Sequence, residues 1–320
     1  MITLSDIRTA QERLKNITIR TKLIPFPLCA EDPRRLLLKP ENQQPIGAFK
    51  LRGAYNKIAS LSEEERKKGV ISYSSGNHAQ GVAYAARALK TKSVIVMPNN
   101  APQIKREATA KLGAEIVLVG PGSEERKTKA EELAAHHGYI IVPPYNDEHI
   151  IAGQGTIGLE ILEELPEVET VLSPVGGGGL ISGVAAAIKL TNPKVKVIGV
   201  EPELAADALA SLRQGKIVQF PAEQVSRTFA DGLRTQSIGP INFEHIRAYV
   251  DDIITVNEDE IRKAMKYLSA NPQTVAEPSG AVATAGFIFH AKDLPQSEVN
   301  VAIISGGNIE PAMLEELRRS

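Results

Sequence analysis

Lys50 is the residue of this chain best placed for covalent chemistry, because it stands in the mainly apolar and small-residue stretch PIGAFKLRGAYNKI (residues 45–58). Most lysines keep their ammonium group in water, and a lysine in such a stretch can reach solvent along its aliphatic stem. A buried lysine, by contrast, has a lowered pKa and a partly neutral amine that can condense with a carbonyl group. The stretch alone leaves a surface amine and a reactive amine both open.

Gly176–Gly179 form an unbroken run of glycines between two apolar segments, in SPVGGGGLISG. Glycines let the backbone approach a ligand closely, and several N–H groups at a helix start can face one anion. A flexible turn is the alternative, but this run costs more conformational entropy than a turn requires. No Gly-Lys-Ser/Thr follows, and no register has the spacing G-x-G-x-x-G. The run therefore predicts a phosphate site and argues against the two common nucleotide loops.

A second cluster of small polar residues lies in SYSSGNHAQG, which also follows a predicted strand. Ser74, Ser75, Asn77 and His78 would bring hydroxyl, amide and backbone N–H groups to the start of a helix, which suits a small anion such as a carboxylate. A plain N-cap, which needs only one serine, is the alternative. A third cluster, SGGN, places Ser305 at the end of another strand, where a strand-to-helix turn is the simpler explanation.

The elements that must position these clusters alternate along the chain. Short β-branched segments are separated by segments of helical period, such as GNHAQGVAYAARALK and APQIKREATAKLG. Ser62-x-x-Glu65 and Asn257-x-x-Glu260 have the capping-box pattern of helix starts. The predicted strands are residues 69–74, 93–98, 114–120, 139–144, 170–176, 195–202, 251–256 and 299–305. This alternation predicts an α/β fold with parallel sheets covered on both faces, in which ligands bind where strands end.

The composition argues against several classes of partner. The chain has 37 basic and 38 acidic residues and a net charge of -1, so it has no electrostatic basis for binding nucleic acid or an anionic membrane. Cys29 is the single cysteine, which excludes an internal disulfide and a cysteine-cluster metal site and fits a reducing cytoplasm. No apolar run resembles a signal peptide or a membrane span. We expect a soluble, cytoplasmic protein that acts on a small molecule.

The motifs GAFKLRGA, SSGNHAQG, GGGGL and SGGN, in this order over nearly the entire chain, resemble the serine/threonine dehydratase and serine racemase group of fold type II pyridoxal-phosphate enzymes. The resemblance implies a tryptophan synthase β-like fold, with two open twisted parallel-sheet lobes and the cofactor in the cleft. We expect a large cofactor-binding domain (residues 1–67 and 148–320) and a small inserted domain (residues 68–147). The resemblance also implies a homodimer.

By this resemblance, Lys50 would hold pyridoxal 5'-phosphate as an internal Schiff base, with Phe49 beside the ring. The amides of Gly176, Gly177, Gly178, Gly179 and Leu180 would bind the phosphate. Asn77 would bond the phenolic oxygen, and Ser305 would meet the pyridine nitrogen. A neutral hydroxyl at that nitrogen, in place of a carboxylate, gives a weaker electron sink, which suits elimination.

The resemblance also implies a reaction. Serine or threonine would rest its carboxylate on the second cluster, Lys50 would take the Cα proton, and loss of hydroxide would lead to a 2-oxo acid and ammonia. Ser75 would return a proton on the opposite face, because racemase-like relatives read Ser-Ser-Gly-Asn here and threonine dehydratases commonly read Ser-Ala-Gly-Asn. We therefore expect an ammonia-lyase that also interconverts L- and D-serine. The further substrate-binding candidates are Arg126, Asn146, Asp231 and Thr235.

The segment VEPELAADAL resembles the family's divalent-metal site, with Glu201, the Ala205 carbonyl and Asp207 as oxygen ligands for Mg²⁺ or Ca²⁺. Without the resemblance, two carboxylates at this spacing are ordinary surface charges. Two other functions stay open at this point. One is a 3-hydroxyaspartate dehydratase, which needs a cation for the second carboxylate, and the other is a noncatalytic amino-acid-binding protein on the same fold. A β-replacement synthase is a weaker candidate, and nucleotide activation stays open.

Overall fold

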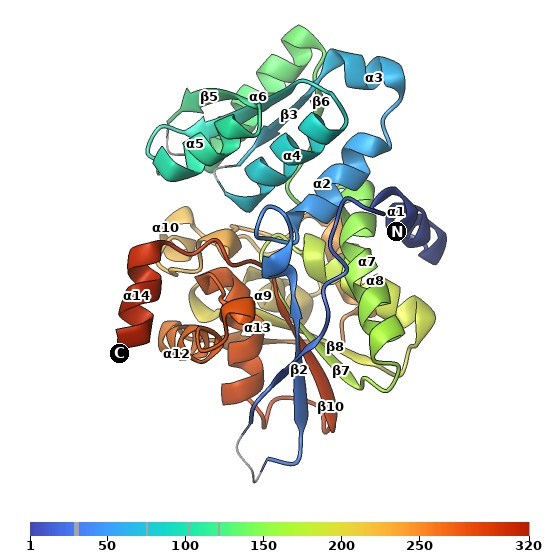
Figure 1. Ribbon diagram of the computed structural model, residues 1–320, viewed down its shortest axis with the longest axis vertical. Coiled ribbons are helices and arrows are strands. Elements are labelled where there is room, and N and C mark those ends of the chain that lie inside the picture. Colours follow the sequence, from blue (N-terminus) through green and yellow to red (C-terminus); the bar gives the residue numbers. More distant parts are fainter. Residues whose placement is uncertain (29–31, 75, 102, 121, 320) are drawn as a thin grey trace.

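The computed structural model describes residues 1–28, 32–74, 76–101, 103–120 and 122–319. Its ribbon has two lobes, each built on one sheet, with the smaller lobe above the larger one in Figure 1. The larger sheet has six strands and the smaller sheet has four. The predicted α/β class with two parallel-sheet lobes is therefore confirmed.

The larger sheet has the strand order β1-β2-β10-β7-β8-β9. Its strands are parallel except at one edge, where β1 runs antiparallel to β2. In the centre of the sheet, Val171 of β7 is paired with Val301 of β10 and with Val197 of β8. The strands are β1 Ile24–Phe26, β2 Arg35–Pro40, β7 Thr170–Pro174, β8 Lys196–Pro202, β9 Asp252–Val256 and β10 Val299–Ile304.

The smaller sheet has the order β5-β4-β3-β6 and is parallel throughout. Its strands are β3 Val70–Tyr73, β4 Ser93–Pro98, β5 Glu115–Val119 and β6 Ile140–Ile141. Parallel strands need crossover connections, and helices provide most of them in both lobes. The helices of the described residues are α1 Leu4–Arg13, α2 Lys50–Ala59, α3 Glu63–Lys68, α4 Asn77–Ala88, α5 Gln103–Lys111, α6 Ser123–His137, α7 Glu148–Glu164, α8 Gly179–Thr191, α9 Asp207–Gln214, α10 Ala222–Val225, α11 Pro240–Tyr249, α12 Glu258–Leu268, α13 Pro278–Phe289 and α14 Pro311–Arg319, with 3-10 turns η1 Glu41–Gln43, η2 Glu203–Ala205, η3 Asp231–Leu233 and η4 Pro272–Thr274.

Successive side chains of a strand point to opposite faces of its sheet, and helices pack on both faces of each sheet. In β7, Leu172 packs into an apolar layer with α12 and α13, whereas Val171 packs into the opposite layer with α7, α8 and α11. In the smaller sheet, Ile95 faces α2 and α4, whereas Val94 faces α6. The sandwich of helix, sheet and helix is thus repeated in both lobes.

All eight predicted strands are present, most of them shortened by one to four residues. The capping boxes Ser62–Glu65 and Asn257–Glu260 form as predicted, with both reciprocal hydrogen bonds. β1 and β2 were not predicted, and β1 is the exception to the expected parallel pairing.

Helix α2 packs on both α4 and α7, since Ala54 and Ile58 share one apolar cluster with Ala83 of α4 and Ile150 of α7. The helix therefore does not belong to one lobe alone, and the domain boundaries at residues 67 and 148 stay a prediction. None of the helices in the described ranges has the length and apolar character that crossing a membrane requires.

Candidate functional site

A cavity of about 530 Å³ is lined by residues from both lobes. It brings together residues of all four sequence motifs, although these are far apart in the chain. Ser75 lies outside the described residues, so its predicted position is not part of this description. The predicted residues that line the cavity are Phe49, Lys50, Ser74, Asn77, His78, Arg126, Asn146, Gly176, Gly177, Gly178, Gly179, Leu180, Asp231, Thr235 and Ser305.

Lys50 is the first residue of α2, and its amine ends inside the cavity. The Nζ atom donates a hydrogen bond to the Pro144 carbonyl at 2.7 Å and lies 5.2 Å from the centre of the Phe49 ring. Burial lowers the Lys50 pKa to about 8, because the charged form loses its hydration. Of the two interpretations left open by the sequence, the reactive amine is the one that this position favours.

A buried ion network fixes the helix turn that carries Lys50. Arg52, with a fully buried side chain, donates to Glu41 at 2.7 Å and to Glu160 at 2.6 Å. Lys39 donates to the same Glu160 at 2.6 Å. The network joins α2 to β2, η1 and α7, so the backbone at Lys50 is held by charge-assisted hydrogen bonds on the side away from the cavity.

The glycine run forms a buried loop that ends in the first turn of α8. Gly178 has φ +90°, a conformation that glycine adopts without strain. A Cβ atom on Gly177 would overlap the ring of Tyr145, so a side chain there would have to displace that ring. The first N–H groups of a helix have no acceptor within the helix, and here they are buried beside the cavity. This arrangement suits an anion such as a phosphate.

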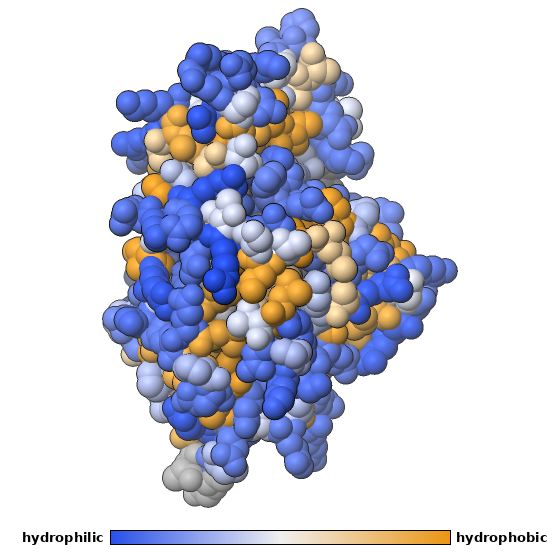
Figure 2. All heavy atoms as spheres, turned by 90° about the vertical axis from the view of Figure 1, so that its right-hand side faces the viewer, coloured by the Kyte–Doolittle hydropathy of each residue, from blue (hydrophilic) through white to orange (hydrophobic). Residues whose placement is uncertain are grey.

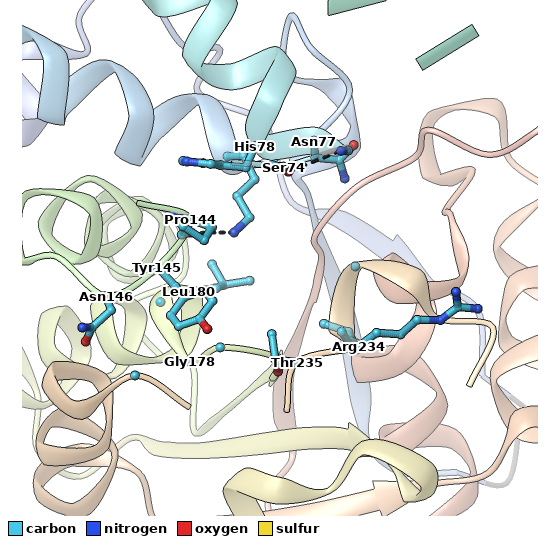
Figure 3. Close-up of a pocket in the computed structure, with 18 of the residues that line it drawn as sticks. Ser74, Asn77, His78, Pro144, Tyr145, Asn146, Gly178, Leu180, Arg234 and Thr235 are labelled. Atoms are coloured by element: carbon cyan, nitrogen blue, oxygen red, sulfur yellow. Dashed lines mark hydrogen bonds between the residues drawn. The ribbon is translucent and has the colours of Figure 1, made fainter. Parts of the chain in front are cut away.

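Tyr145 was not predicted as a site residue. It lines the cavity, and its ring packs against the glycine run. In Figure 3, Tyr145 and Pro144 lie between the Ser74–His78 side of the cavity and Gly178 on the opposite side. The only sequence signal was an aromatic residue after a predicted strand, which by itself indicates core packing.

Ser74, Asn77 and His78 lie at the start of α4, on one side of the cavity (Figure 3). Asn77 Nδ2 donates to Glu277 Oε1 at 2.6 Å, and Asn77 Oδ1 accepts from Asn308 Nδ2 at 2.7 Å. Both bonds fix the orientation of the Asn77 amide. One N–H of that amide is left to point at a ligand.

The His78 side chain does not suit the carboxylate contact predicted for it. Burial, together with the nearby Lys50, lowers the His78 pKa to about 3, so the ring is neutral. Nε2 is 3.0 Å from the Val142 carbonyl and therefore carries the proton. Nδ1 is then an acceptor, and it has no partner within the described part of the chain. A carboxylate contact from His78 stays a prediction for its backbone N–H alone.

Glu277 is a second residue that sequence reasoning missed. Its carboxyl group lines the cavity, is buried, and accepts the hydrogen bond from Asn77. Burial and the charge of Asp231 raise its pKa to about 7. It caps α13 in the segment VAEPSG, where an acidic residue before proline indicates only a helix start.

The other predicted substrate residues differ in how free their side chains are. Asp231 forms an ion pair with Lys105 at 2.8 Å. Asn146 accepts from the backbone N–H of Ile241 at 3.0 Å, so its Oδ1 is engaged away from the cavity. The Thr235 hydroxyl is buried and has no hydrogen-bond partner in the described ranges.

The predicted metal ligands lie outside this cavity. Glu201 is fully buried and accepts from the backbone N–H groups of Ala208 and Leu209 at 3.0 and 2.7 Å, at the start of α9. Asp207 is also fully buried, and its carboxyl oxygens make no hydrogen bond of full geometry among the described residues, although the backbone N–H groups of Ile238 and of Asp207 itself lie near enough to favour the ionised form. Burial raises the pKa of Asp207 to about 7, and burial together with Asp207 raises that of Glu201.

Comparison with known proteins gives consistent matches. A family model described as pyridoxal-phosphate dependent enzyme matches residues 14–306. An L-threonine ammonia-lyase of Thermotoga maritima is 48% identical over 318 residues, which cover 99% of this chain and 78% of that protein. An L-threo-3-hydroxyaspartate ammonia-lyase of Saccharomyces cerevisiae is 40% identical over 309 residues, which cover 96% and 94%. The solved structure of maize serine racemase matches with a TM-score of 0.92 at 36% identity and covers 98% of this chain and 96% of that one.

Proposed function

Because the chain belongs to the family of pyridoxal-phosphate-dependent enzymes, in the group of threonine ammonia-lyases and serine racemases, we propose that it converts L-threonine and L-serine to a 2-oxo acid and ammonia. We further propose that it interconverts L- and D-serine. The observation that carries the proposal is the meeting of a buried lysine amine, a loop of glycine amides and the polar start of α4 in one cavity.

The donor groups of the cavity fit pyridoxal 5'-phosphate. The buried amides from Gly176 to Leu180 suit its phosphate, and the Lys50 amine suits its aldehyde. The Asn77 amide is proposed for the phenolic oxygen and the Ser305 hydroxyl for the pyridine nitrogen. When bound, the cofactor supplies an electron sink for the negative charge that develops at the substrate Cα.

Lys50 is proposed to hold the cofactor and to move the Cα proton. An amine with a pKa near 8 has a substantial neutral fraction at neutral to mildly basic pH, which both roles require. The Pro144 carbonyl, at 2.7 Å, positions the Nζ atom.

The start of α4 is proposed to bind the substrate carboxylate, through Ser74, the Asn77 amide and the backbone N–H groups of the first turn. A helix N-terminus favours an anion, because its N–H groups and the helix dipole both point outward. Ser75 is proposed to return a proton to Cα on the face opposite Lys50, which would produce D-serine.

The test of this function is Lys50→Ala, compared with Lys68→Ala, an exposed lysine on α3. We expect borohydride to attach the cofactor to the peptide that contains Lys50, and the Lys50→Ala protein to lose about 100-fold or more in turnover of L-threonine. Lys68→Ala should behave as the wild type. Normal production of 2-oxobutyrate by Lys50→Ala would rule the proposal out.

A 3-hydroxyaspartate ammonia-lyase is the second candidate, because Lys105 is among the basic residues that line the cavity and such a relative matches nearly the whole chain. Parallel assays with L-serine, L-threonine and L-threo-3-hydroxyaspartate decide between the two. A clear preference for the third substrate would favour this candidate.

We also propose a divalent cation at Glu201, the Ala205 carbonyl and Asp207. Support comes from the two buried carboxyl oxygens of Asp207, which make no hydrogen bond of full geometry in the described residues, since hard cations such as Mg²⁺ and Ca²⁺ bind oxygen ligands. Within the described residues no group of three ionisable ligands is present, so backbone carbonyl groups and water would complete the shell.

A homodimer and a cytoplasmic location complete the proposal. In Figure 2 the hydrophobic residues of this face lie in separate groups among hydrophilic ones, so the homodimer is proposed from the likeness to the family. Light scattering coupled to size exclusion would measure the mass. The cytoplasmic location rests on the single cysteine, which fits a reducing compartment.

A further inference from the structure

Lys105 and Asp231 form an ion pair that joins the two lobes across the cavity. Lys105 belongs to α5 beside the smaller sheet, and Asp231 belongs to η3 of the larger lobe. Their Nζ and Oδ2 atoms are 2.8 Å apart, and both residues line the cavity. The side chains are 25% and 44% exposed, so the pair is screened by solvent only in part.

A second carboxyl group, that of Glu277, interacts electrostatically with the same ammonium. Glu277 lines the cavity, and its charge interacts favourably with Lys105 and unfavourably with Asp231. Lys105 is therefore paired with Asp231 and interacts in addition with the ionised fraction of Glu277. A ligand that carries a carboxylate of its own would therefore meet a Lys105 ammonium that is already paired with Asp231.

The other cations of the cavity wall are engaged as well. Arg234 donates to the Thr228 carbonyl at 2.7 Å and points away from the cavity centre in Figure 3. Lys127 lies 4.0 Å from Glu131, and Arg126 also has an interaction partner. Breaking the ion pair with Asp231 would therefore give the cavity an unpaired positive charge on Lys105.

We propose that Asp231 is a specificity determinant: by holding Lys105 it disfavours substrates with an acidic β-substituent and favours those with an uncharged one, such as serine and threonine. The inference rests on the proposed ammonia-lyase function and names the substrate class of that site. An acidic substrate would have to take Lys105 from Asp231 and would leave Asp231 unpaired near Glu277. Leaving a partly buried charge without its partner is unfavourable.

Asp231→Asn tests the inference, because it keeps the shape of the side chain and removes its charge. We expect the ratio of kcat/KM for L-threo-3-hydroxyaspartate to that for L-threonine to rise about tenfold or more, which corresponds to ~1.4 kcal/mol. The gain should disappear in the double variant Asp231→Asn/Lys105→Met. Asp259→Asn, which makes the same charge change on the exposed surface of α12, should leave the ratio as in the wild type.

If Asp231→Asn loses turnover of every substrate, the inference can still be tested by the binding of two ligands of similar shape and different charge. L-Aspartate and L-asparagine differ in charge but scarcely in shape, and neither has a β-hydroxyl to eliminate. Their affinities for the holoenzyme can be read from the change in cofactor absorbance. A rise in the aspartate-to-asparagine affinity ratio supports the inference, and an unchanged or lower ratio overturns it.

The failure of the inference and the failure of the proposed function look different. A wild type that prefers L-threo-3-hydroxyaspartate would overturn the inference while an ammonia-lyase remains. A wild type that releases ammonia from none of the three substrates would overturn the function, and the aspartate-to-asparagine ratio would still decide whether Asp231 selects against acidic ligands.

Discussion

Glu277 is a buried carboxyl group in a cavity that also contains the acidic Asp231 and is proposed to hold an anionic cofactor. Its hydrogen bond from Asn77 favours the ionised form, but burial and Asp231 outweigh it and raise the pKa to about 7. Between about pH 4.5 and 7, the folded protein therefore keeps a proton on Glu277, whereas the unfolded chain has lost it. By linkage, this group makes folding less favourable as the pH rises through that range.

Glu277→Gln should remove this pH dependence. We expect the free energy of unfolding of the cofactor-free variant, relative to the wild type, to improve as the pH rises from about 5 to 8, by up to about 3 kcal/mol, since each pKa unit corresponds to about 1.36 kcal/mol. Urea unfolding at several pH values measures it. If the free energies of unfolding of the two proteins changed with pH in parallel, Glu277 would not titrate in this range.

Some site residues could be recognised from the sequence around them, and others could not. Lys50 and Gly176–Gly179 were predicted because an amine in an apolar segment and a glycine run are unusual in themselves. Tyr145 and Glu277 acquire their positions from contacts with residues far along the chain, Gly177 and Asn77 respectively. Such contacts exist only after the lobes have formed, so local pattern could not indicate them.

At the scale of elements, the difference between local and long-range signals also explains why β2 was not predicted, although eight other strands were. Its sequence RLLLKP contains Lys39, which argues against a buried strand when the segment is considered alone. In the structure Lys39 is fully buried and paired with Glu160, a residue of α7. The neutralising partner is supplied by tertiary structure, and this is why the apolar run in β2 did not suffice as a signal.

Arg52→Met should destabilise the protein, because it leaves the buried Glu41 without its cationic partner and the buried Glu160 with Lys39 alone. Burial alone would raise the Glu160 pKa, but Arg52 and Lys39 outweigh it and lower the pKa. We expect the free energy of unfolding to fall by about 3–5 kcal/mol at neutral pH. The loss should shrink in acid, where Glu160 becomes protonated in the variant. Chemical denaturation gives the value.

Arg87→Met is the matched control, since Arg87 is exposed on α4. Its effect on unfolding should stay within about 0.5 kcal/mol. A similarly small effect of Arg52→Met would show that the network does not hold α2 in place.

At the scale of the whole molecule, strand and helix alternation correctly predicted parallel sheets covered by helices, and the likeness to a known family correctly implied their division into two lobes. The alternation did not predict how the lobes are joined, because α2 lies before the smaller sheet in sequence yet packs on helices of both lobes. The glycine loop and the start of α4 meet in the cavity only through this arrangement. The likeness of the motifs to a known family supplied what the residue pattern could not, namely which clusters belong to one site.

The proposed cation is a further link within the larger lobe. We expect Mg²⁺ or Ca²⁺ to raise the melting temperature of the wild type, because ligand that binds only the folded state stabilises it. Asp207→Asn should abolish the increase, whereas Asp259→Asn, on the exposed surface, should retain it. Differential scanning calorimetry in chelator-treated buffer measures the effect. An equal increase in both variants would exclude Asp207 as a ligand.

The position of Lys50 at the start of the helix that contacts both lobes has a mechanical consequence. Helix α2 packs on α4 beside the smaller sheet and on α7 beside the larger one, so a displacement of one lobe relative to the other would strain the contacts of α2. The Lys105–Asp231 ion pair adds a second contact between the lobes, and it would have to break for the two walls of the cavity to separate.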